Sequence, residues 1–262
     1  MTRGTVRGHR VVGAGLLLLL ASAGCGSPAR DSGDGGATAA PPVRDKGPVC
    51  VGEAPADGVR VLRGGGFRLP GGTGVQYAGA SADGSSRTAT LREGARYEEG
   101  QREWKVAVGA RVPLAGHAYT VRQVCSYRVV LEAASARDAS ALAEAPASMT
   151  STGGEADAGL CFTTNRAVLK AASDGFPAEG ESLSLVGNGG VRRFPTGLSL
   201  TVSYLDAEAG TAGIAANCAA VPVAAYGELR VGEPLELGGV LFEVTDVTEA
   251  VVRLTRPAAP RP

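Results

Sequence analysis

Hydrophobic and polar residues alternate along several short stretches of the chain. In the stretch HAYTVRQV, Tyr119 and Val121 share one face of an extended strand, whereas Thr120 and Arg122 share the other. The stretch VLFEVTDV, residues 240–247, repeats the pattern. Short strands of this kind, separated by glycine-rich turns, recur through both halves of the chain, so we expect an all-β protein.

The two halves also match each other in sequence. Residues 108–132 align with residues 231–255 without a gap, at a constant separation of 123 positions. The matched pairs are identical or nearly so: Val108/Val231, Gly109/Gly232, Leu114/Leu237, Gly116/Gly239, Tyr119/Phe242, Val121/Val244, Val124/Val247, Val129/Val252 and Leu131/Leu254. This self-similarity predicts two tandem small antiparallel β domains, each a barrel or a sandwich, related by internal duplication.

The segments upstream of this match correspond more loosely. Each has a short apolar strand that ends in a tyrosine, Tyr77 in one half and Tyr204 in the other. Each half also opens with a cysteine, so the repeat is expected to span most of each half. On the same constant separation, Trp104 falls opposite Gly227, and we expect Trp104 to have a packing role in the first half alone.

Composition sets the expected boundaries of the two domains. We assign residues 49–134 to β domain 1, residues 160–257 to β domain 2 and residues 258–262 to a disordered tail. Residues 135–159 are rich in Ala, Ser and Gly and read as a linker, with a short helix near Ser135 to Ala145 as the alternative for its first part. We expect the two units to be separable, although a single shared core is the alternative.

The first 24 residues have the three-part pattern of a secretory signal. Three arginines precede an apolar run from Val11 to Leu20, which is too short to span a bilayer, and four small residues follow. Cys25 comes directly after them. This arrangement resembles the lipobox of bacterial secreted lipoproteins, although Ser22 stands where that family commonly has Leu.

The resemblance implies that the signal peptide, residues 1–24, is removed and that Cys25 is lipidated. In this family the cysteine receives a diacylglycerol on its sulfur, and its new amino terminus can be acylated as well. Two acyl chains give stable membrane anchoring, so the lipid bilayer is the expected partner and the outer face of the cell membrane the expected location. Residues 25–48 would then form a lipidated flexible tether. Cleavage by an ordinary signal peptidase after Ala23 or Gly24 is the alternative. The abundance of Ala, Gly and Arg resembles the composition of actinobacterial proteins.

Charge argues against a nucleic-acid partner. The chain has 26 basic and 26 acidic residues, and removal of residues 1–24 takes away three arginines and no acid. A nucleic-acid-binding protein should instead show a concentrated basic face. The expected partners besides the bilayer are a protein or an envelope polymer.

Cysteine parity supports the lipid anchor. Acylation of Cys25 leaves four cysteines, and an oxidising compartment favours their pairing. We predict the disulfides Cys50–Cys125 and Cys161–Cys218, because pairing within each unit needs no contact across the linker. Metal ligation is the rival interpretation, but no two cysteines have short ligand-like spacing, so we expect neither a metal nor another cofactor.

The remaining candidate residues favour structural roles. His117 is the one histidine beyond the signal and falls opposite Val240, so we predict a packing or edge role rather than a general base. The glycine clusters at 63–67 and 186–191 precede strand-like sequence rather than a helix, which predicts hairpin turns rather than phosphate-binding loops.

Two pairs of carboxylates, Glu98 with Glu99 and Asp206 with Glu208, lack the run of oxygen ligands of a calcium loop. We therefore expect no catalytic residue and a non-enzymatic binding or structural module of the cell envelope, whose ligand the sequence does not indicate. An envelope hydrolase, or an accessory subunit of one, is the alternative.

Overall fold

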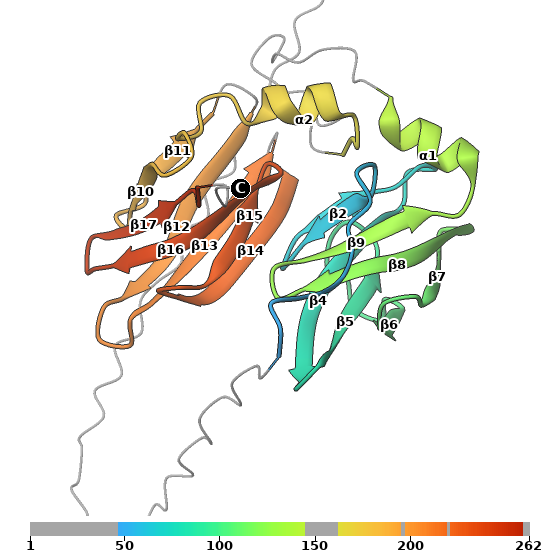
Figure 1. Cartoon of the computed structure of the whole chain (residues 1–262), viewed down its shortest axis with the longest axis horizontal. Coiled ribbons are helices and arrows are strands. Elements are labelled where there is room, and N and C mark those ends of the chain that lie inside the picture. The colour runs from blue at the N-terminus through green and yellow to red at the C-terminus, as the bar shows by residue number, and fades with distance from the viewer. Residues whose placement is uncertain (1–46, 145–161, 195–196, 219–220, 259–262) are drawn as a thin grey trace, which may run out of the picture. The chain divides into compact units, whose positions relative to one another are not determined.

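The computed structural model describes residues 47–144, 162–194, 197–218 and 221–258. Cys25 and Cys161, and the predicted signal peptide and most of the predicted tether and linker, lie outside these residues. The described chain is mostly β, as predicted. Figure 1 shows strands β2–β9, drawn blue to green, in one group and strands β10–β17, drawn gold to red, in another.

The first repeat contains two antiparallel sheets. One has the strand order β1–β8–β9–β2, with β7 also paired to β8, and the other has the order β3–β4–β5–β6. The strands are β1 Cys50–Gly52, β2 Val59–Leu62, β3 Gly66–Arg68, β4 Gly74–Asp83, β5 Ser86–Glu93, β6 Glu103–Val106, β7 Arg111–Leu114, β8 His117–Cys125 and β9 Arg128–Ala133.

The second repeat has the same plan. Its sheets have the orders β10–β17–β16–β15 and β11–β12–β13–β14, again antiparallel. The strands are β10 Ser182–Val186, β11 Val191–Arg193, β12 Leu198–Asp206, β13 Thr211–Cys218, β14 Val221–Arg230, β15 Pro234–Leu237, β16 Val240–Val247 and β17 Val251–Thr255.

The two repeats correspond strand for strand. Strands β2 to β9 have the order and pairing of β10 to β17, and β1 is an addition to the first repeat. Even the local irregularities recur: a register shift follows Val121 on β8 and Val244 on β16. The amides of Gly109 and Gly232, both with positive φ, donate to the carbonyls of Val121 and Val244 over 2.8 Å.

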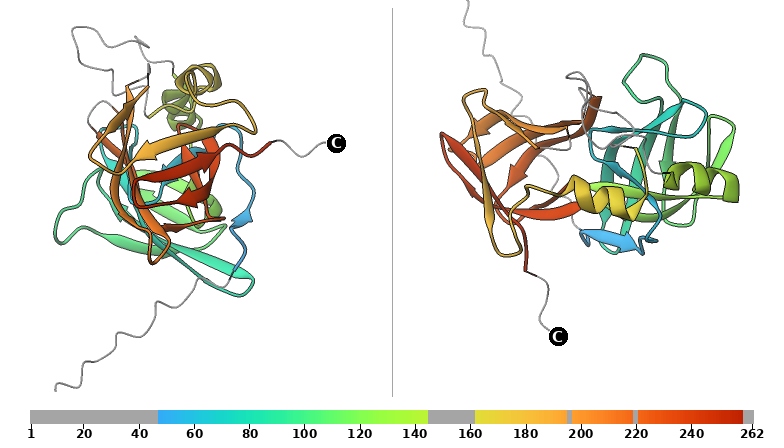
Figure 2. Two further views of the ribbon diagram at one scale, coloured as in Figure 1. Left: turned by 90° about the vertical axis from the view of Figure 1, so that its left-hand side faces the viewer. Right: turned by 90° about the horizontal axis from the view of Figure 1, so that it is seen from above.

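Each repeat is a sandwich of two open sheets rather than a closed barrel. One hydrophobic core joins residues from both sheets of the first repeat, including Val61 and Tyr119 from one sheet and Tyr77 and Leu91 from the other. A second core does the same in the second repeat. The two views in Figure 2 show the strands of each group from further directions. The all-β prediction is confirmed, with the sandwich as the form that the sheets take.

In the segments upstream of the ungapped match, the two tyrosines that end the apolar strands, Tyr77 and Tyr204, do not occupy equivalent positions. Tyr77 and Val202 both precede a register shift and pair with Leu91 and Ile214, so Tyr77 corresponds to Val202 rather than to Tyr204. Tyr77 is fully buried, whereas Tyr204 is exposed.

Trp104 is also matched differently in the structure. It pairs with Leu91 as Tyr226 pairs with Ile214, because the second repeat has one more residue in the bulge around Glu228. Trp104 packs against the core of its repeat, as predicted, but its counterpart Tyr226 packs in a core too. Its role is therefore shared by both repeats.

The glycine clusters turn the chain between sheets. Neither joins two paired strands: residues 63–65 connect β2 to β3 and residues 187–190 connect β10 to β11, and each of these strand pairs is split between two sheets. The prediction of hairpins is wrong here, because the glycines let the chain cross from one layer of the sandwich to the other.

Two short helices lie among the strands. Helix α1, Ala136–Ala143, follows β9 at the start of the predicted linker, and helix α2, Arg166–Ala172, precedes β10 (Figure 2). Ser135 caps α1 by accepting a hydrogen bond from the amide of Asp138, and Asn165 caps α2.

Candidate functional site

The loop between β2 and β3 of the first repeat makes hydrogen bonds to strand β14 of the second repeat. The carbonyl of Arg63 accepts a hydrogen bond from the amide of Ala225 on β14 over 2.8 Å, and its guanidinium donates to the carbonyl of Gly227 over 2.9 Å. Gly64 and Gly65 lie so close to β14 that an added Cβ at either position would overlap the β14 backbone. Glycine is needed here for close approach of two backbones.

A buried ion pair lies beside this contact. Arg128 on β9 of the first repeat donates a hydrogen bond to the carboxylate of Glu236 on β15 of the second. The Glu236 side chain is 2% exposed, and that of Arg128 is 16% exposed. Arg60 on β2 also faces Glu236, with 3.9 Å between its Nε and Glu236 Oε1. One buried carboxylate of the second repeat is therefore flanked by two arginines of the first.

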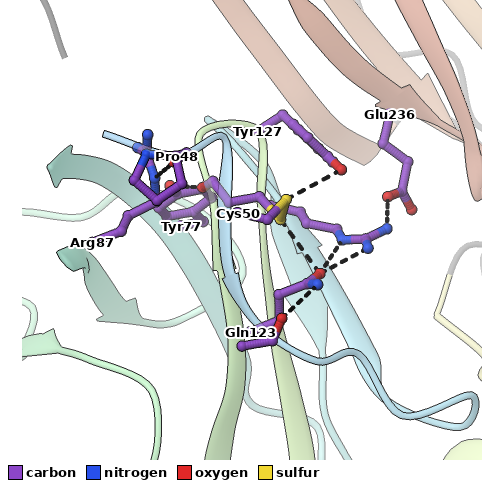
Figure 3. Close-up of a disulfide and its surroundings, with 10 residues drawn as sticks. Pro48, Cys50, Tyr77, Arg87, Gln123, Tyr127 and Glu236 are labelled. Carbon is purple, nitrogen blue, oxygen red and sulfur yellow. Dashed lines mark hydrogen bonds and ion pairs between the residues drawn. A yellow bond between two sulfur atoms is a disulfide. The ribbon is translucent and has the colours of Figure 1, made fainter. Parts of the chain in front are cut away.

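The disulfide of the first repeat lies next to this ion pair (Figure 3). Cys50 and Cys125 face each other across β1 and β8 and are bonded, as predicted. The side-chain oxygen of Gln123 accepts hydrogen bonds from Arg128 at Nε, over 3.1 Å, and at a terminal nitrogen, over 2.8 Å. Gln123 thereby holds the guanidinium in position towards Glu236.

Two tyrosines complete the surroundings of Glu236. Tyr127 lies between the disulfide and the second repeat, with its hydroxyl 3.5 Å from Cys50 Sγ (Figure 3), and its ring belongs to the second repeat's core. The Tyr226 hydroxyl donates to the backbone carbonyl of Glu236 over 2.8 Å. Burial raises the pKa of Tyr226 well above its ordinary value, which keeps this donor neutral.

A partly open cavity of about 90 Å³ lies between the repeats at this position. We call it the inter-repeat cavity. Its walls are mostly apolar, with Leu62 and Phe67 from the first repeat and Leu169, Leu198 and Val223 from the second. Arg60 and Glu236 supply charge to the lining. A concave apolar site with a few convergent polar groups is the usual form of a ligand-binding pocket.

Arg60, one of the residues that line this cavity, has a donor without a hydrogen-bond partner among the described residues. Its Nε is buried and makes no hydrogen bond within the part of the chain that the structure describes. The 3.9 Å to Glu236 is too long for a hydrogen bond, although it is an ion-pair distance. A buried donor without an acceptor costs free energy, so the Arg60 guanidinium is only partly satisfied by Glu236.

His117 lies elsewhere, at the edge of the first repeat. Its Nδ1 is 2.8 Å from a carboxylate oxygen of Asp138 in α1, and its side chain is 31% exposed. The hydrogen bond from His117 is the largest cause that lowers the pKa of Asp138, and a hydrogen bond from Ser135 adds to it. Ser135 thus contacts Asp138 rather than His117. In a catalytic triad the serine is hydrogen-bonded to the histidine, so this arrangement does not activate Ser135 as a nucleophile.

The other predicted site residues are not brought together with the cavity, apart from one cysteine. Cys218 lines the cavity and is a disulfide cysteine. Its predicted partner Cys161 and the predicted lipidation site Cys25 lie outside the described residues. Among the residues that the structure does describe, no group of three or more His, Cys, Asp or Glu side chains could hold a metal ion.

Sequence reasoning missed the inter-repeat residues. Glu236 lies opposite Pro113 in the repeat, and Arg128 lies opposite Val251, so the alignment gives no sign of a shared role. On its strand, Glu236 alternates with the core residues Leu235 and Leu237 and would face solvent in an isolated sandwich. It is buried because the first repeat covers it. The sequence signal for this site is the charged Glu236 in the PLEL strand, because the matching position of the first repeat is the uncharged Pro113.

Comparison with known proteins found no relative of this chain. No family model matches the chain, and no curated protein or solved structure is significantly similar to it. Within the described ranges, no helix combines the length and apolar character needed to cross a bilayer.

Proposed function

We propose that this protein is a lipoprotein anchored through acylated Cys25 to the outer face of the cell membrane, where it acts as a non-enzymatic binding module of the cell envelope. The observation that carries the binding function is the inter-repeat cavity, which both repeats line and which contains the charged pair Arg60 and Glu236. The lipobox-like sequence at Cys25 supports the location.

The position of the cavity fits a binding role for a duplicated protein. Neither repeat alone has this cavity, because its apolar walls come from β2 and β3 on one side and from α2, β12 and β14 on the other. Duplication followed by divergence at Arg60, Arg128 and Glu236 would create such a site between two units of the same fold. The ligand would then contact both repeats at once.

An envelope hydrolase, or an accessory subunit of one, is the alternative, and the hydrogen bond between His117 and Asp138 favours it. Asp138 would hold the imidazole in one orientation, as the third member of a catalytic triad does. The geometry argues against the hydrolase, because Ser135, the serine beside this pair, contacts Asp138 rather than the histidine.

Photo-crosslinking in intact cells separates these functions. A diazirine analogue of leucine at Leu169, in the cavity wall, should capture an envelope component in place. The same analogue at Leu241, on the exposed face of β16, is the matched control and should capture none. Equal capture from both positions would contradict binding at the cavity.

The His117→Ala variant tests the alternative in the same cells. A binding module should capture the same component with the same yield in this variant. Accumulation of an intact component that the unaltered protein normally cleaves would instead favour the hydrolase.

A further inference from the structure

We infer that the inter-repeat cavity binds a short aliphatic carboxylate, with its chain against the apolar walls and its head group on Arg60. This inference rests on the proposed binding function and names the ligand class of that site. Three properties of the cavity carry it: its size, its apolar walls and the positive charge in its lining.

Size limits the ligand to a few carbon atoms. An engineered apolar cavity of about 150 Å³ holds benzene, and the inter-repeat cavity measures about 90 Å³. A chain of about four carbons is therefore the largest group that the cavity encloses, judged against that reference. The walls formed by Leu169, Leu198 and Val223 suit an aliphatic chain, because they offer no polar side-chain atom.

Charge selects the head group. Two arginines, Arg60 and Arg128, face the single carboxylate of Glu236, so this cluster carries an excess positive charge. Arg128 is already held by Glu236 and Gln123, whereas Arg60 Nε lacks an acceptor within the described residues. A carboxylate at Arg60 would neutralise the excess charge and accept hydrogen bonds from the guanidinium, whereas an ammonium would be repelled.

Two sources can present this chemistry in the cell envelope. One is a free short-chain acid, and the other is the aliphatic C-terminal residue of a peptide. Both place a carboxylate next to a short apolar group, and the partly open form of the cavity admits either.

Methyl NMR of the purified full-length protein tests the inference, with butyrate as the probe. We expect saturable shifts at the methyl groups of Leu169, Leu198 and Val223. Acetate should bind about 15-fold more weakly, because each buried methylene adds roughly fourfold in affinity. Butylamine should cause no shift at these methyl groups.

The peptide source is tested with N-acetyl-Gly-Val and its C-terminal amide. Binding of the peptide acid without binding of the amide would identify a peptide C-terminus as the source.

Variants connect binding to the named residues. Arg60→Gln should weaken butyrate binding at least tenfold, whereas Arg111→Gln, at an exposed arginine on β7, should leave it unchanged. Leu169→Trp should fill the cavity and abolish binding, and Leu241→Trp is its matched control on an exposed face. The Leu169 variant changes a half-buried helix residue, so it provides an answer even if Arg60→Gln does not fold.

The outcomes are distinct for this inference and for the proposed function. Equal binding of butyrate and butylamine, unchanged binding in a folded Arg60→Gln protein, or no shift at the cavity methyl groups would overturn the inference. If crosslinking at Leu169 still captured an envelope component, the binding function would stand and its ligand would belong to another class. Failure of both experiments would overturn both.

Discussion

Arg128 of the first repeat and Glu236 of the second form a buried ion pair that connects two sandwiches of the same fold. Gln123 orients the arginine, and the Cys50–Cys125 disulfide lies directly beside it. Tyr127, next in the chain to Arg128, packs into the core of the second repeat. The repeats therefore contact each other through both a polar pair and apolar surface.

The first prediction concerns this pair. Arg128→Leu should lower the free energy of unfolding by about 3 kcal/mol, because it leaves a buried carboxylate short of its closest partner. The double variant with Glu236→Leu should recover most of that loss. Denaturant titration measures both. As a control, Arg122→Leu breaks the exposed 3.6 Å pair with Glu132 and should cost less than about 1 kcal/mol. A double variant no more stable than Arg128→Leu alone would contradict the account.

The C-terminal part of each repeat could be predicted from sequence because its alternation and its turns are local properties. The ungapped match of residues 108–132 with residues 231–255 reproduces strands β7–β9 and β15–β17. The core pair Tyr119 and Phe242 is fully buried at both positions. Strand faces and glycine turns depend on neighbouring residues, which a sequence shows directly.

The upstream register and the cavity could not be predicted, because both depend on distant contacts. A single extra residue in the bulge around Glu228 moved the counterpart of Trp104 from Gly227 to Tyr226. The burial of Glu236 depends on a surface contributed by the other repeat. Helix α1 is a short Ala-rich segment capped by Ser135, and its composition fits a linker as well as a helix.

The second prediction concerns the disulfide. Replacing both Cys50 and Cys125 by Ser should lower the free energy of unfolding by up to about 4 kcal/mol on the chain-entropy model, because the bond closes a loop with a sequence separation of 75. It should also free β1, which consists of three residues. Thermal unfolding and hydrogen exchange at Val51 measure the two effects. Peptide mapping without reduction checks the pairing itself, and a peptide joining Cys50 to Cys161 would overturn it.

The third prediction concerns the anchor. Because Cys25 follows an apolar run and four small residues, Cys25→Ala should release the protein from the membrane or leave the signal uncut. Cell fractionation and the mass of the amino-terminal peptide give the readout, and Cys50→Ala is the matched control at a cysteine with another role. Normal processing with unchanged membrane retention in Cys25→Ala would rule out lipidation at this residue.

The fourth prediction contrasts two buried tyrosines. The Tyr77 hydroxyl donates to the carbonyl of Cys125 over 2.7 Å, so Tyr77→Phe should cost about 1–2 kcal/mol of stability. The Tyr119 hydroxyl is buried without a hydrogen-bond partner in the described residues, so Tyr119→Phe should cost nothing and should gain up to about 1 kcal/mol. Equal losses in the two variants would show that Tyr119 has a partner in solution.

Alkaline titration gives a second readout for Tyr119. Burial, with a smaller contribution from the negative charge of Asp138, raises the pKa of Tyr119 to about 12. The neutral phenol therefore contributes stability that is complete below the unfolded-state pKa of about 10 and is lost as the pH rises through 12. Tyr119→Phe should reduce the loss of stability in this window, and its difference from the unaltered protein should be constant below it.

The last prediction concerns acid stability at Asp138. The hydrogen bond from His117 holds the pKa of Asp138 below its usual range, with a further contribution from Ser135. A carboxyl whose pKa is lower in the folded state stabilises the protein fully above its unfolded-state pKa, about 3.9, and this contribution disappears as the pH falls through the folded value. The stability difference between the unaltered protein and Asp138→Asn should therefore be constant above about pH 5 and shrink on acidification below about pH 4. Denaturant titration across this range measures it. A difference that stayed constant down to pH 2 would mean that His117 does not hold Asp138 in solution, and it would remove the observation that favours the hydrolase alternative.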